Sequence, residues 1–384
     1  MKLSNTFKKK IFTAPLLILA TMFGFSQQNL ANPSGFEIKR GVNLSHWLSQ
    51  NFGWSPKATF ITEKDIKFID SVGYDHVRIP IDEFEMWNND GTPLDESFTY
   101  LTNCLDWCAK YKLRAIVDLH ILRAHHFNAE NEGRKITLWT DIVAQNNFIK
   151  LWKDISGYLK KYPVSMVAYE LMNEAVAPDN EDWNKLIARA VVAIRKLEPS
   201  RVLVIGSNKW QQSQFFPFLK VPENDKNIIL SLHIYSPINF THYLANWTAF
   251  KDYKGPVHYP GQIVTDADYK KYVDTNNADY VQSMINSKNV YNKKVLTDEL
   301  LPAIQKAKEL NLQLYCGEFG CLPHVDRTAR LKYYDDIISA FEENNIAWCN
   351  WEYKGDFGIY NFDFKKFVAL KPDFEMINVL MQKK

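Results

Sequence analysis

Short apolar runs alternate with longer amphipathic segments along most of the chain, from about residue 36 to the C-terminus. Most of the runs are nearly continuous in apolar character, which is typical of strands that are buried on both faces of a parallel sheet. Turn-forming or charged residues bound each run. The predicted strands are residues 37–43, 76–81, 113–120, 165–172, 201–207, 227–233, 312–318 and 346–352.

The segments between these strands have helical periodicity. The predicted helices are residues 63–72, 97–111, 141–161, 181–197, 299–310, 328–343 and 373–382, with a shorter one near 212–219. Parallel strands that are separated by helices indicate an α/β protein. Eight such units predict a single closed (β/α)8 TIM barrel.

The interval between the sixth and seventh predicted strands is too long for one crossover helix. Residues 237–297 of this interval are rich in Tyr, Asn, Lys and Asp. Loops after the strands of a barrel tolerate insertions, so we expect an inserted subdomain above the barrel mouth. The predicted catalytic domain spans 27–384 and includes this insertion.

The first residues have the pattern of an export signal. Lysines lie at positions 2 and 8–10, an apolar stretch follows, and the small residues Gly24 and Ser26 precede Gln27. We predict a signal peptide over residues 1–26 and a periplasmic or extracellular location, with no membrane attachment after cleavage. A membrane anchor is the alternative, although the apolar stretch is short for a spanning helix.

Composition and charge narrow the possible functions. The chain has 46% hydrophobic residues, which suits a large globular core. Removal of residues 1–26 takes away four of the 46 basic residues and none of the 44 acidic ones, which leaves a net charge of −2. Because no basic patch remains, we expect no nucleic-acid partner. We expect a monomer.

The cysteines and histidines do not indicate a metal site. The chain has five cysteines, so at least one thiol is unpaired, and we expect all five to be buried and free. No Cys-x-x-Cys pair is present, and the histidines are scattered along the chain. The predicted metal content is none, and no cofactor is expected.

Polar side chains lie at the predicted C-terminal ends of six strands, where a barrel builds its active site. Such groups are costly in a barrel core unless a ligand or a partner satisfies them. The candidates are Arg78, Asp118, His120, Asn173, Glu174, His233, Tyr235, Glu318, Trp351 and Glu352. For the histidines, Tyr235 and Trp351, ordinary packing near the barrel mouth is the alternative.

Two of these residues are carboxylic acids from different strands, Glu174 and Glu318. Across a barrel mouth their side chains can approach to about 5 Å, which suits a retaining glycosidase. Arg78 and His233 are neighbours that can separate the two pKa values. Capping of the next helix, or pairing with a lysine, is the alternative for Glu174 alone.

Seven motifs follow one another along the chain: "RGVNLSHW", "HVRIP", "VDLH", "ELMNEAV", "LHIYSP", "YCGEFG" and "CNWEYK". In this order and spacing they resemble glycoside hydrolase family 5, the cellulase family A. The resemblance covers residues 36–382 and is nearest in appearance to clostridial β-1,4-endoglucanases. It implies a metal-independent hydrolase in which Glu174 is the acid/base and Glu318 is the nucleophile.

The resemblance also implies roles for the neighbouring residues. Arg78 and Tyr235 would lie beside the nucleophile, and His233 would lie near the acid/base. Asn173 would bind the 2-hydroxyl of the sugar at the cleavage site. The two residues that would line that sugar are His120 and Trp351.

The loop after the third predicted strand departs from the family pattern. It reads "LHILRAHHFN", without the His-Ala-Pro-Gly turn of the related endoglucanases. His125 and His126 are therefore candidate sugar contacts. Trp47 and the tryptophans at 54, 87, 210 and 247 are candidate stacking surfaces, with loop packing as the alternative. Glu352 either binds a sugar hydroxyl or pairs with Lys354.

These patterns predict a secreted retaining hydrolase of β-linked glucan, with an endo-acting β-1,4-glucanase as the first expectation. A β-mannanase or glucomannanase, and an exo-acting β-1,3-glucanase, are the alternatives on the same scaffold. A non-catalytic carbohydrate-binding protein is the alternative of a different class. The expected partner is a β-glucan polysaccharide or oligosaccharide.

Overall fold

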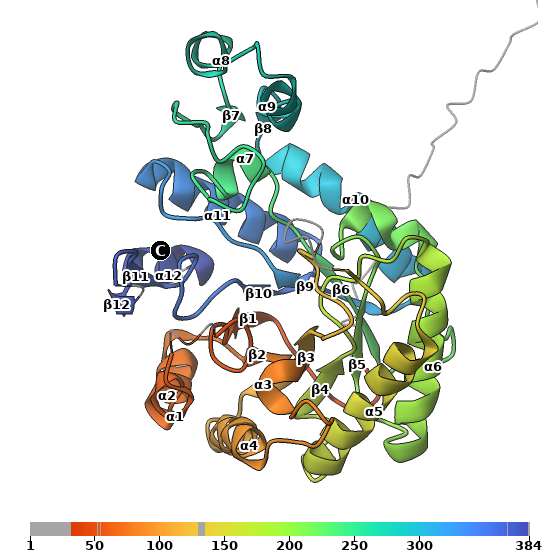
Figure 1. Ribbon diagram of the computed structural model, residues 1–384. Helices are drawn as coiled ribbons and strands as arrows, with labels where there is room; N and C mark the ends of the chain where they lie inside the picture. The colour runs from red at the N-terminus through yellow and green to blue at the C-terminus, as the bar shows by residue number, and fades with distance from the viewer. Residues whose placement is uncertain (1–31, 52, 54, 130–134, 367, 383–384) are drawn as a thin grey trace, which may run out of the picture. The chain divides into compact units, whose positions relative to one another are not determined.

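Eight parallel strands close into a barrel in the computed structural model, which describes residues 32–382 except 52, 54, 130–134 and 367 (Figure 1). The order around the barrel is β1-β2-β3-β4-β5-β6-β9-β10, and β10 pairs with β1. The strands are β1 (Arg40–Asn43), β2 (His76–Asp82), β3 (Arg114–Ile121), β4 (Val167–Glu170), β5 (Leu203–Gly206), β6 (Ile228–His233), β9 (Gln313–Glu318) and β10 (Ala347–Asn350). The predicted TIM barrel is confirmed, whereas the predicted signal peptide lies outside the described residues.

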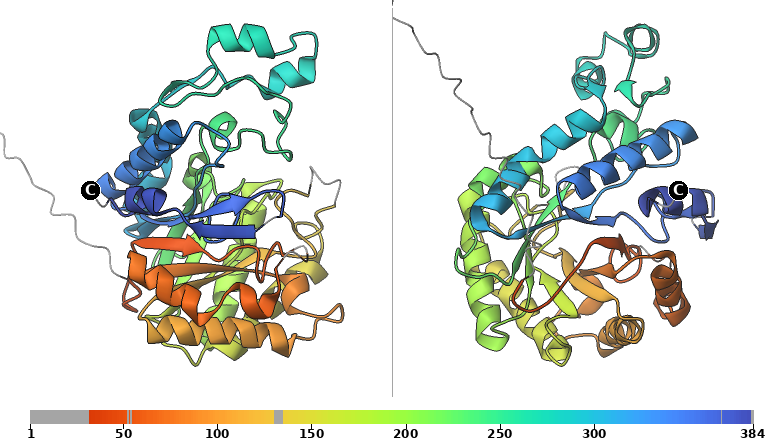
Figure 2. Two further views of the ribbon diagram at one scale, coloured as in Figure 1. Left: turned by 90° about the vertical axis from the view of Figure 1, so that its left-hand side faces the viewer. Right: turned by 180° about the vertical axis from the view of Figure 1, so that it is seen from behind.

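Helices surround the barrel and connect successive strands (Figures 1 and 2). They are α2 (Glu63–Val72), α4 (Asp95–Lys110), α5 (Ile142–Leu159), α6 (Asn180–Leu197), the 3-10 helix η1 (Ser213–Phe218), α10 (Lys293–Leu310), α11 (Arg327–Glu343) and α12 (Phe374–Leu380). Each was predicted from periodicity. The short helices α1 (Lys57–Phe60) and α3 (Glu83–Met86) were not.

Side-chain caps fix where the long helices begin. The carboxylates of Asp141, Asp179 and Asp326 accept hydrogen bonds from the first-turn amides of α5, α6 and α11. Asn292 caps α10 in the same way, so this helix starts six residues before the predicted position. The early turns of α10 are polar, which hid them from the periodicity argument.

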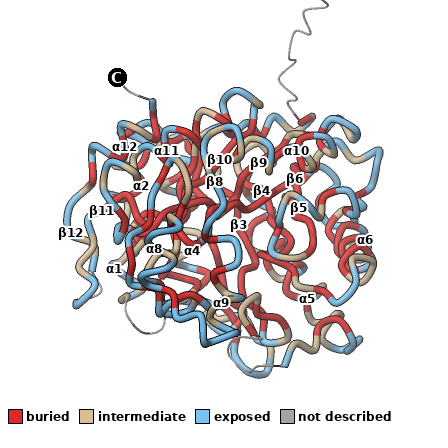
Figure 3. The backbone as a smooth tube through the Cα atoms, turned by 90° about the horizontal axis from the view of Figure 1, so that it is seen from above, coloured by how far each residue is buried: buried red, intermediate tan, exposed pale blue. Residues whose placement is uncertain are grey.

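The strands are buried on both faces, as their continuous apolar sequences indicated. One core cluster fills the barrel and includes Ile116, Val204 and Ile229. A larger cluster lies between the barrel and its helices. Figure 3 shows the buried strands in red inside a pale blue rim of exposed loops. All five cysteines are buried and free, as predicted.

The chain between β6 and α10 forms small elements of its own. These are α7 (Ile238–Thr241), β7 (Gly261–Gln262), α8 (Asp266–Tyr272), α9 (Ala278–Ser283) and β8 (Val290–Tyr291). Strands β7 and β8 pair antiparallel. Figures 1 and 2 show these elements together, beyond α10 and α11. The first turn of α10 lies inside the predicted 237–297 segment, so the extra elements end at Tyr291.

A C-terminal hairpin was not predicted. Strands β11 (Tyr360–Asp363) and β12 (Val368–Pro372) pair antiparallel between β10 and α12. Most of their side chains are exposed or half-buried, so the hairpin lacks the continuous apolar pattern of the barrel strands. Among the described residues, no helix is both long and apolar enough to cross a membrane.

Gly41 on β1 gives a test of the barrel packing. A Cβ at this position would lie 2.2 Å from Nε2 of His76, which is buried on the neighbouring strand β2. We expect Gly41→Ala to lower the free energy of unfolding in urea by about 1–3 kcal/mol, because the core cannot relax around the added methyl group.

Gly157→Ala is the matched control. Gly157 lies inside α5, and its added Cβ would meet no atom within 4 Å. Alanine favours a helix over glycine, so this variant should be as stable as the wild type or more stable. Equal stability of Gly41→Ala and the wild type would contradict the described packing.

Candidate active site

Arg78 projects from β2 into a buried polar network. Its Nε donates to Glu170 Oε2 at 2.6 Å, and its Nη1 donates to Glu318 Oε1 at 2.7 Å. Its Nη2 donates to Asn173 Oδ1 at 2.8 Å and lies 3.0 Å from Asp118 Oδ2. One guanidinium therefore joins the side chains of β3, β4 and β9 at the barrel mouth.

Burial alone would lower the pKa of Arg78, but the carboxylates of Asp118, Glu170 and Glu318 outweigh it and raise the pKa well above the ordinary value. The arginine stays charged. Asn43 on β1 also accepts from Nη1 at 3.0 Å and donates to the carbonyl of Gly317 at 2.9 Å. This contact ties the first strand to the last residues of β9.

Glu318 ends β9 and is held on both carboxylate oxygens. Arg78 donates to Oε1, and the hydroxyl of Tyr235 donates to Oε2 at 3.0 Å. Burial raises the pKa of Tyr235 well above its usual range, and the charges of Glu318 and Glu174 add to the effect. The tyrosine therefore keeps its proton and stays a donor to Glu318.

Glu174 follows β4 in a left-handed backbone conformation, with φ of 43°. Its amide donates to Gln211 Oε1 at 2.8 Å, which helps to hold this unusual turn. Its Oε1 lies 2.9 Å from Nδ1 of His233. Carboxylate oxygens of Glu174 and Glu318 lie within 4.8 Å of each other and of a His233 ring nitrogen.

The two carboxyl groups have different environments. Burial and the negative charge of Glu318 raise the pKa of Glu174 well above its ordinary value. Burial also raises the pKa of Glu318, but the charge of Arg78 and the hydrogen bond from Tyr235 oppose this. Glu318 is therefore the group that ionises first, while Glu174 keeps its proton to higher pH.

His233 is neutral in this setting. Burial lowers its pKa well below the ordinary value, and the charge of Arg78 acts in the same direction. The ring therefore contacts Glu174 without carrying a charge that would help that carboxyl group to ionise.

His120 and Trp351 form a flat wall beside these groups. Their rings stack 5.6 Å apart with an angle of 9° between the planes. His120 Nδ1 donates to Asp118 Oδ2 at 2.7 Å, and burial lowers the pKa of His120 to about 3. A neutral imidazole stacked on an indole offers a surface for a sugar ring.

The two histidines of the loop after β3, both candidate sugar contacts, have different surroundings. His125 is buried, packs edge-on against Trp139 and accepts a hydrogen bond from the amide of Val176 through Nε2 at 3.2 Å. It therefore supports the turn that follows Glu174. His126 is also largely buried and packs against the ring of Phe127.

The candidate tryptophans differ in how far their rings are exposed. Trp47 is 1% exposed, and its indole nitrogen donates to the carbonyl of Lys57 at 2.8 Å, so it packs in the core and presents no open ring face. Trp87 is equally buried, and Trp54 lies outside the described residues. Trp210 and Trp247 are 37% and 49% exposed and retain a free surface.

Sequence reasoning missed Gln211. It lies in a run of three residues with positive φ, and its Nε2 donates to Ser231 Oγ at 2.9 Å and to Glu170 Oε1 at 3.2 Å. It thus connects β4, β6 and the turn at Glu174. No periodic pattern marks this position. Glu170 was missed as well, although a charged residue inside an apolar strand is a signal that could have identified it.

Among the residues that the structure describes, two groups of side chains have donor atoms close enough together to hold a metal ion. One is Glu174, His233 and Glu318, and the other is His46, Glu352 and Asp356. In the second group, Nε2 of His46 lies 3.2 Å from Oε2 of the buried Glu352. Of the two alternatives for Glu352, the pairing with Lys354 is not found, because Lys354 lies 2.5 Å from Asp65.

The family model of cellulase, glycosyl hydrolase family 5, matches residues 31–356. The chain belongs to glycosyl hydrolase family 5. It is therefore a glycoside hydrolase, as the motifs predicted. The matched residues include the whole polar network described above, from Asn43 on β1 to Trp351 after β10.

Curated relatives share most of the chain. Endoglucanase C of Acetivibrio thermocellus is 36% identical over 355 residues, which are 90% of this chain and 99% of the relative. Cellodextrinase A of Ruminococcus flavefaciens is 28% identical and covers 81% of this chain and 84% of its own. The predicted resemblance to clostridial endoglucanases is confirmed.

Solved structures agree with the fold. A glycoside hydrolase crystal structure has a TM-score of 0.73 and 23% identity, and covers 90% of this chain and 99% of its own. A structure of Thermotoga maritima Cel5A in complex with cellobiose has a TM-score of 0.68 and 21% identity, and covers 90% and 97%. At these identities the likeness concerns the barrel alone.

Proposed function

We propose that this family 5 hydrolase is a retaining endo-acting β-1,4-glucanase, with Glu174 as the acid/base and Glu318 as the nucleophile. The observation that supports it most is the close pair of carboxyl groups with unequal environments. A separation near 5 Å leaves no room for a water molecule between acid and base, which favours retention over inversion.

In the first step, Glu174 gives its proton to the glycosidic oxygen as that bond breaks. Glu318 attacks the anomeric carbon, and a covalent glycosyl-enzyme forms. Arg78 and Tyr235 hold the attacking carboxylate by one oxygen each and fix its orientation. The elevated pKa of Glu174 keeps this group protonated when the substrate arrives.

In the second step, Glu174 is ionised and takes a proton from water. The water attacks the anomeric carbon from the face that the leaving group has vacated, and Glu318 departs as a carboxylate. The product has the configuration of the substrate. Loss of the Glu318 negative charge in the intermediate lowers the pKa of Glu174, which suits its change from acid to base.

Asn173 is a proposed contact for the sugar 2-hydroxyl. Its Oδ1 is occupied by Arg78, whereas its buried Nδ2 has no hydrogen-bond partner within the described part of the chain. Burial of an unsatisfied amide is costly, so a ligand hydroxyl is the natural acceptor. Arg78 fixes the amide orientation, and the His120–Trp351 wall would lie along the same sugar ring.

The endo-β-1,4-glucan assignment rests on the relatives that cover most of the chain, which include endoglucanase C and cellodextrinase A. The signal-peptide pattern supports export to the periplasm or beyond, and we expect the mature enzyme to act as a monomer on glucan chains. The alternative activities, on mannan, glucomannan or β-1,3-glucan, are tested against this assignment by the assay below.

We expect reducing-sugar release from carboxymethylcellulose and barley mixed-linkage glucan, and little from glucomannan or laminarin. Glu318→Ala should lower the rate by about a thousandfold or more, because no other group can form the covalent intermediate. Glu309→Ala, on the exposed surface of α10, is the matched control and should be fully active. Release from laminarin or glucomannan alone would contradict the proposed substrate.

Tyr235→Phe should move the acidic limb of the kcat/KM profile to higher pH. The lost hydroxyl stabilises the ionised form of Glu318, so its removal raises the pKa of that group, and the enzyme loses its nucleophile at a higher pH than the wild type does. Tyr243→Phe, which removes a hydroxyl bound to the Gly255 carbonyl, is the control and should leave the profile unchanged. An unmoved acidic limb in Tyr235→Phe would contradict the assignment.

A further inference from the structure

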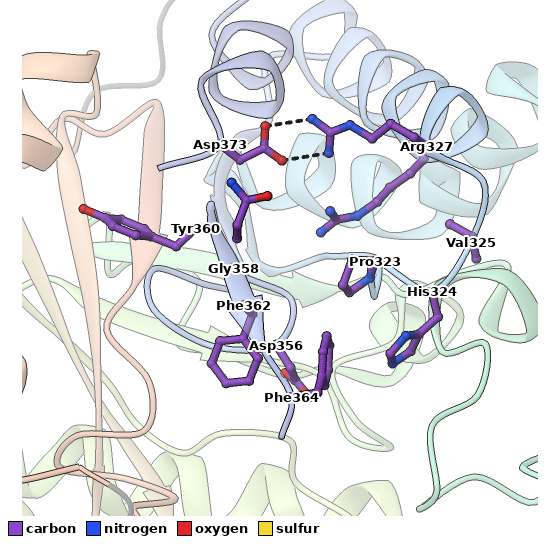
Figure 4. Close-up of a pocket in the computed structure, with 12 residues that line it drawn as sticks. Pro323, His324, Val325, Arg327, Asp356, Gly358, Tyr360, Phe362, Phe364 and Asp373 are labelled. Carbon is purple, nitrogen blue, oxygen red and sulfur yellow. Dashed lines mark hydrogen bonds and ion pairs between the residues drawn. The ribbon is translucent and has the colours of Figure 1, made fainter. Parts of the chain in front are cut away.

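A pocket of about 340 Å³ lies between the loop after β9 and the C-terminal hairpin, apart from the catalytic pair (Figure 4). The residues that matter most for its chemistry are His324, Arg330, Asp356, Tyr360, Phe362 and Phe364. The volume is within the range of small-ligand sites. None of the proposed catalytic steps uses these side chains.

The pocket lies on the catalytic face of the barrel. Its walls come from the segments after β9, which ends at Glu318, and after β10, which ends just before Trp351. Leu322 and Phe357, which are next to pocket residues in the chain, pack with Trp351 and Tyr235 in one small cluster. This cluster therefore connects the chain segments that line the pocket with two residues of the catalytic centre.

Aromatic side chains form one wall of the pocket. The rings of His324 and Phe364 lie 4.6 Å apart at 41°, and Phe362 packs edge-on against Phe364 at 5.2 Å. Phe364 is 41% exposed although it is a large apolar residue. Figure 4 shows Phe362, Phe364 and His324 along the same side. Exposed aromatic faces of this kind suit the C–H face of a sugar ring.

Polar groups on the opposite wall carry little net charge. Arg327 donates to both carboxylate oxygens of Asp373 at 2.7 Å, as Figure 4 shows, and also to Glu375. Arg330 is buried, and its Nε donates a hydrogen bond to the carbonyl of Cys321 at 2.9 Å. Asp356 also lines the pocket and lies beside Phe364 in Figure 4. The two arginines and two aspartates of the lining balance in charge, which favours a neutral polyhydroxyl ligand over an anion.

We propose that this pocket is a second glycosyl-binding site, which holds a glucosyl unit of the polysaccharide outside the catalytic centre. The aromatic wall stacks on the sugar, and Arg330 and Asp356 exchange hydrogen bonds with its hydroxyls. The site keeps a polymer on the catalytic face between cleavages. The polymer identity rests on the function proposed above, but the binding of a neutral sugar does not.

The kinetic test compares a polymer with a short substrate. Phe364→Ala should raise KM for mixed-linkage glucan about fivefold and leave kcat/KM for an aryl β-cellobioside unchanged, since the short substrate does not reach the pocket. His324→Ala should act in the same direction. Phe218→Ala, which removes an even more exposed phenylalanine ring on η1, is the matched control and should change neither value.

An unchanged KM for the polymer in Phe364→Ala, or an equal loss on the short substrate, would overturn the proposal. The binding test measures, by titration calorimetry, the binding of cellotetraose to the Glu318→Gln protein. We expect two binding events, of which Phe364→Ala removes one. A single event that Phe364→Ala does not weaken, or binding of inorganic phosphate in place of the sugar, would also overturn the proposal.

The two proposals fail in different ways. If the wild type cleaves none of the glucans, the proposed function is wrong, while the calorimetry with Glu318→Gln still tests the pocket. If the wild type cleaves mixed-linkage glucan and the Phe364 and His324 variants match it in KM and in binding, the catalytic assignment stands and the second site is wrong.

Discussion

The buried guanidinium of Arg78 is the interaction on which the rest of the site depends. A charge at this depth is tolerated only because three carboxylates and two amides surround it, and their side chains come from four other strands or strand ends. The same contacts orient Glu318 and Asn173. Removal of the arginine would leave buried carboxylates unpaired, so barrel stability and site geometry share one cause.

The barrel makes this network possible because parallel strands bring residues that are distant in sequence to one rim. Arg78 and Glu318 are 240 positions apart, yet they form a 2.7 Å contact. Burial raises the pKa of both glutamates, and the charge of Arg78 opposes this in both. Of the two, it is Glu318 that also accepts hydrogen bonds from Arg78 and from the hydroxyl of Tyr235. The functional difference between two identical side chains thus comes from their neighbours.

Much of this arrangement could be predicted from the sequence, and the exceptions have physical reasons. Buried strands give continuous apolar runs, and a polar residue at the end of such a run stands out, as Glu174 and Glu318 did. The hairpin of β11 and β12 was missed because it has no fully buried face. Gln211 was missed because its left-handed turn has no periodic signature. His125 and Trp47 were candidate sugar contacts with packing as the alternative, and each has a ring nitrogen bonded to a backbone group inside the fold, a contact that no sequence pattern marks.

The central claim is that Glu318 attacks the sugar directly while Glu174 serves as acid and then base. Proton NMR of the first product released from a cello-oligosaccharide, recorded before mutarotation, tests it most directly. The account predicts the β-anomer, because two displacements at one carbon restore its configuration. Initial release of the α-anomer would mean a single displacement by water and would contradict the role assigned to Glu318.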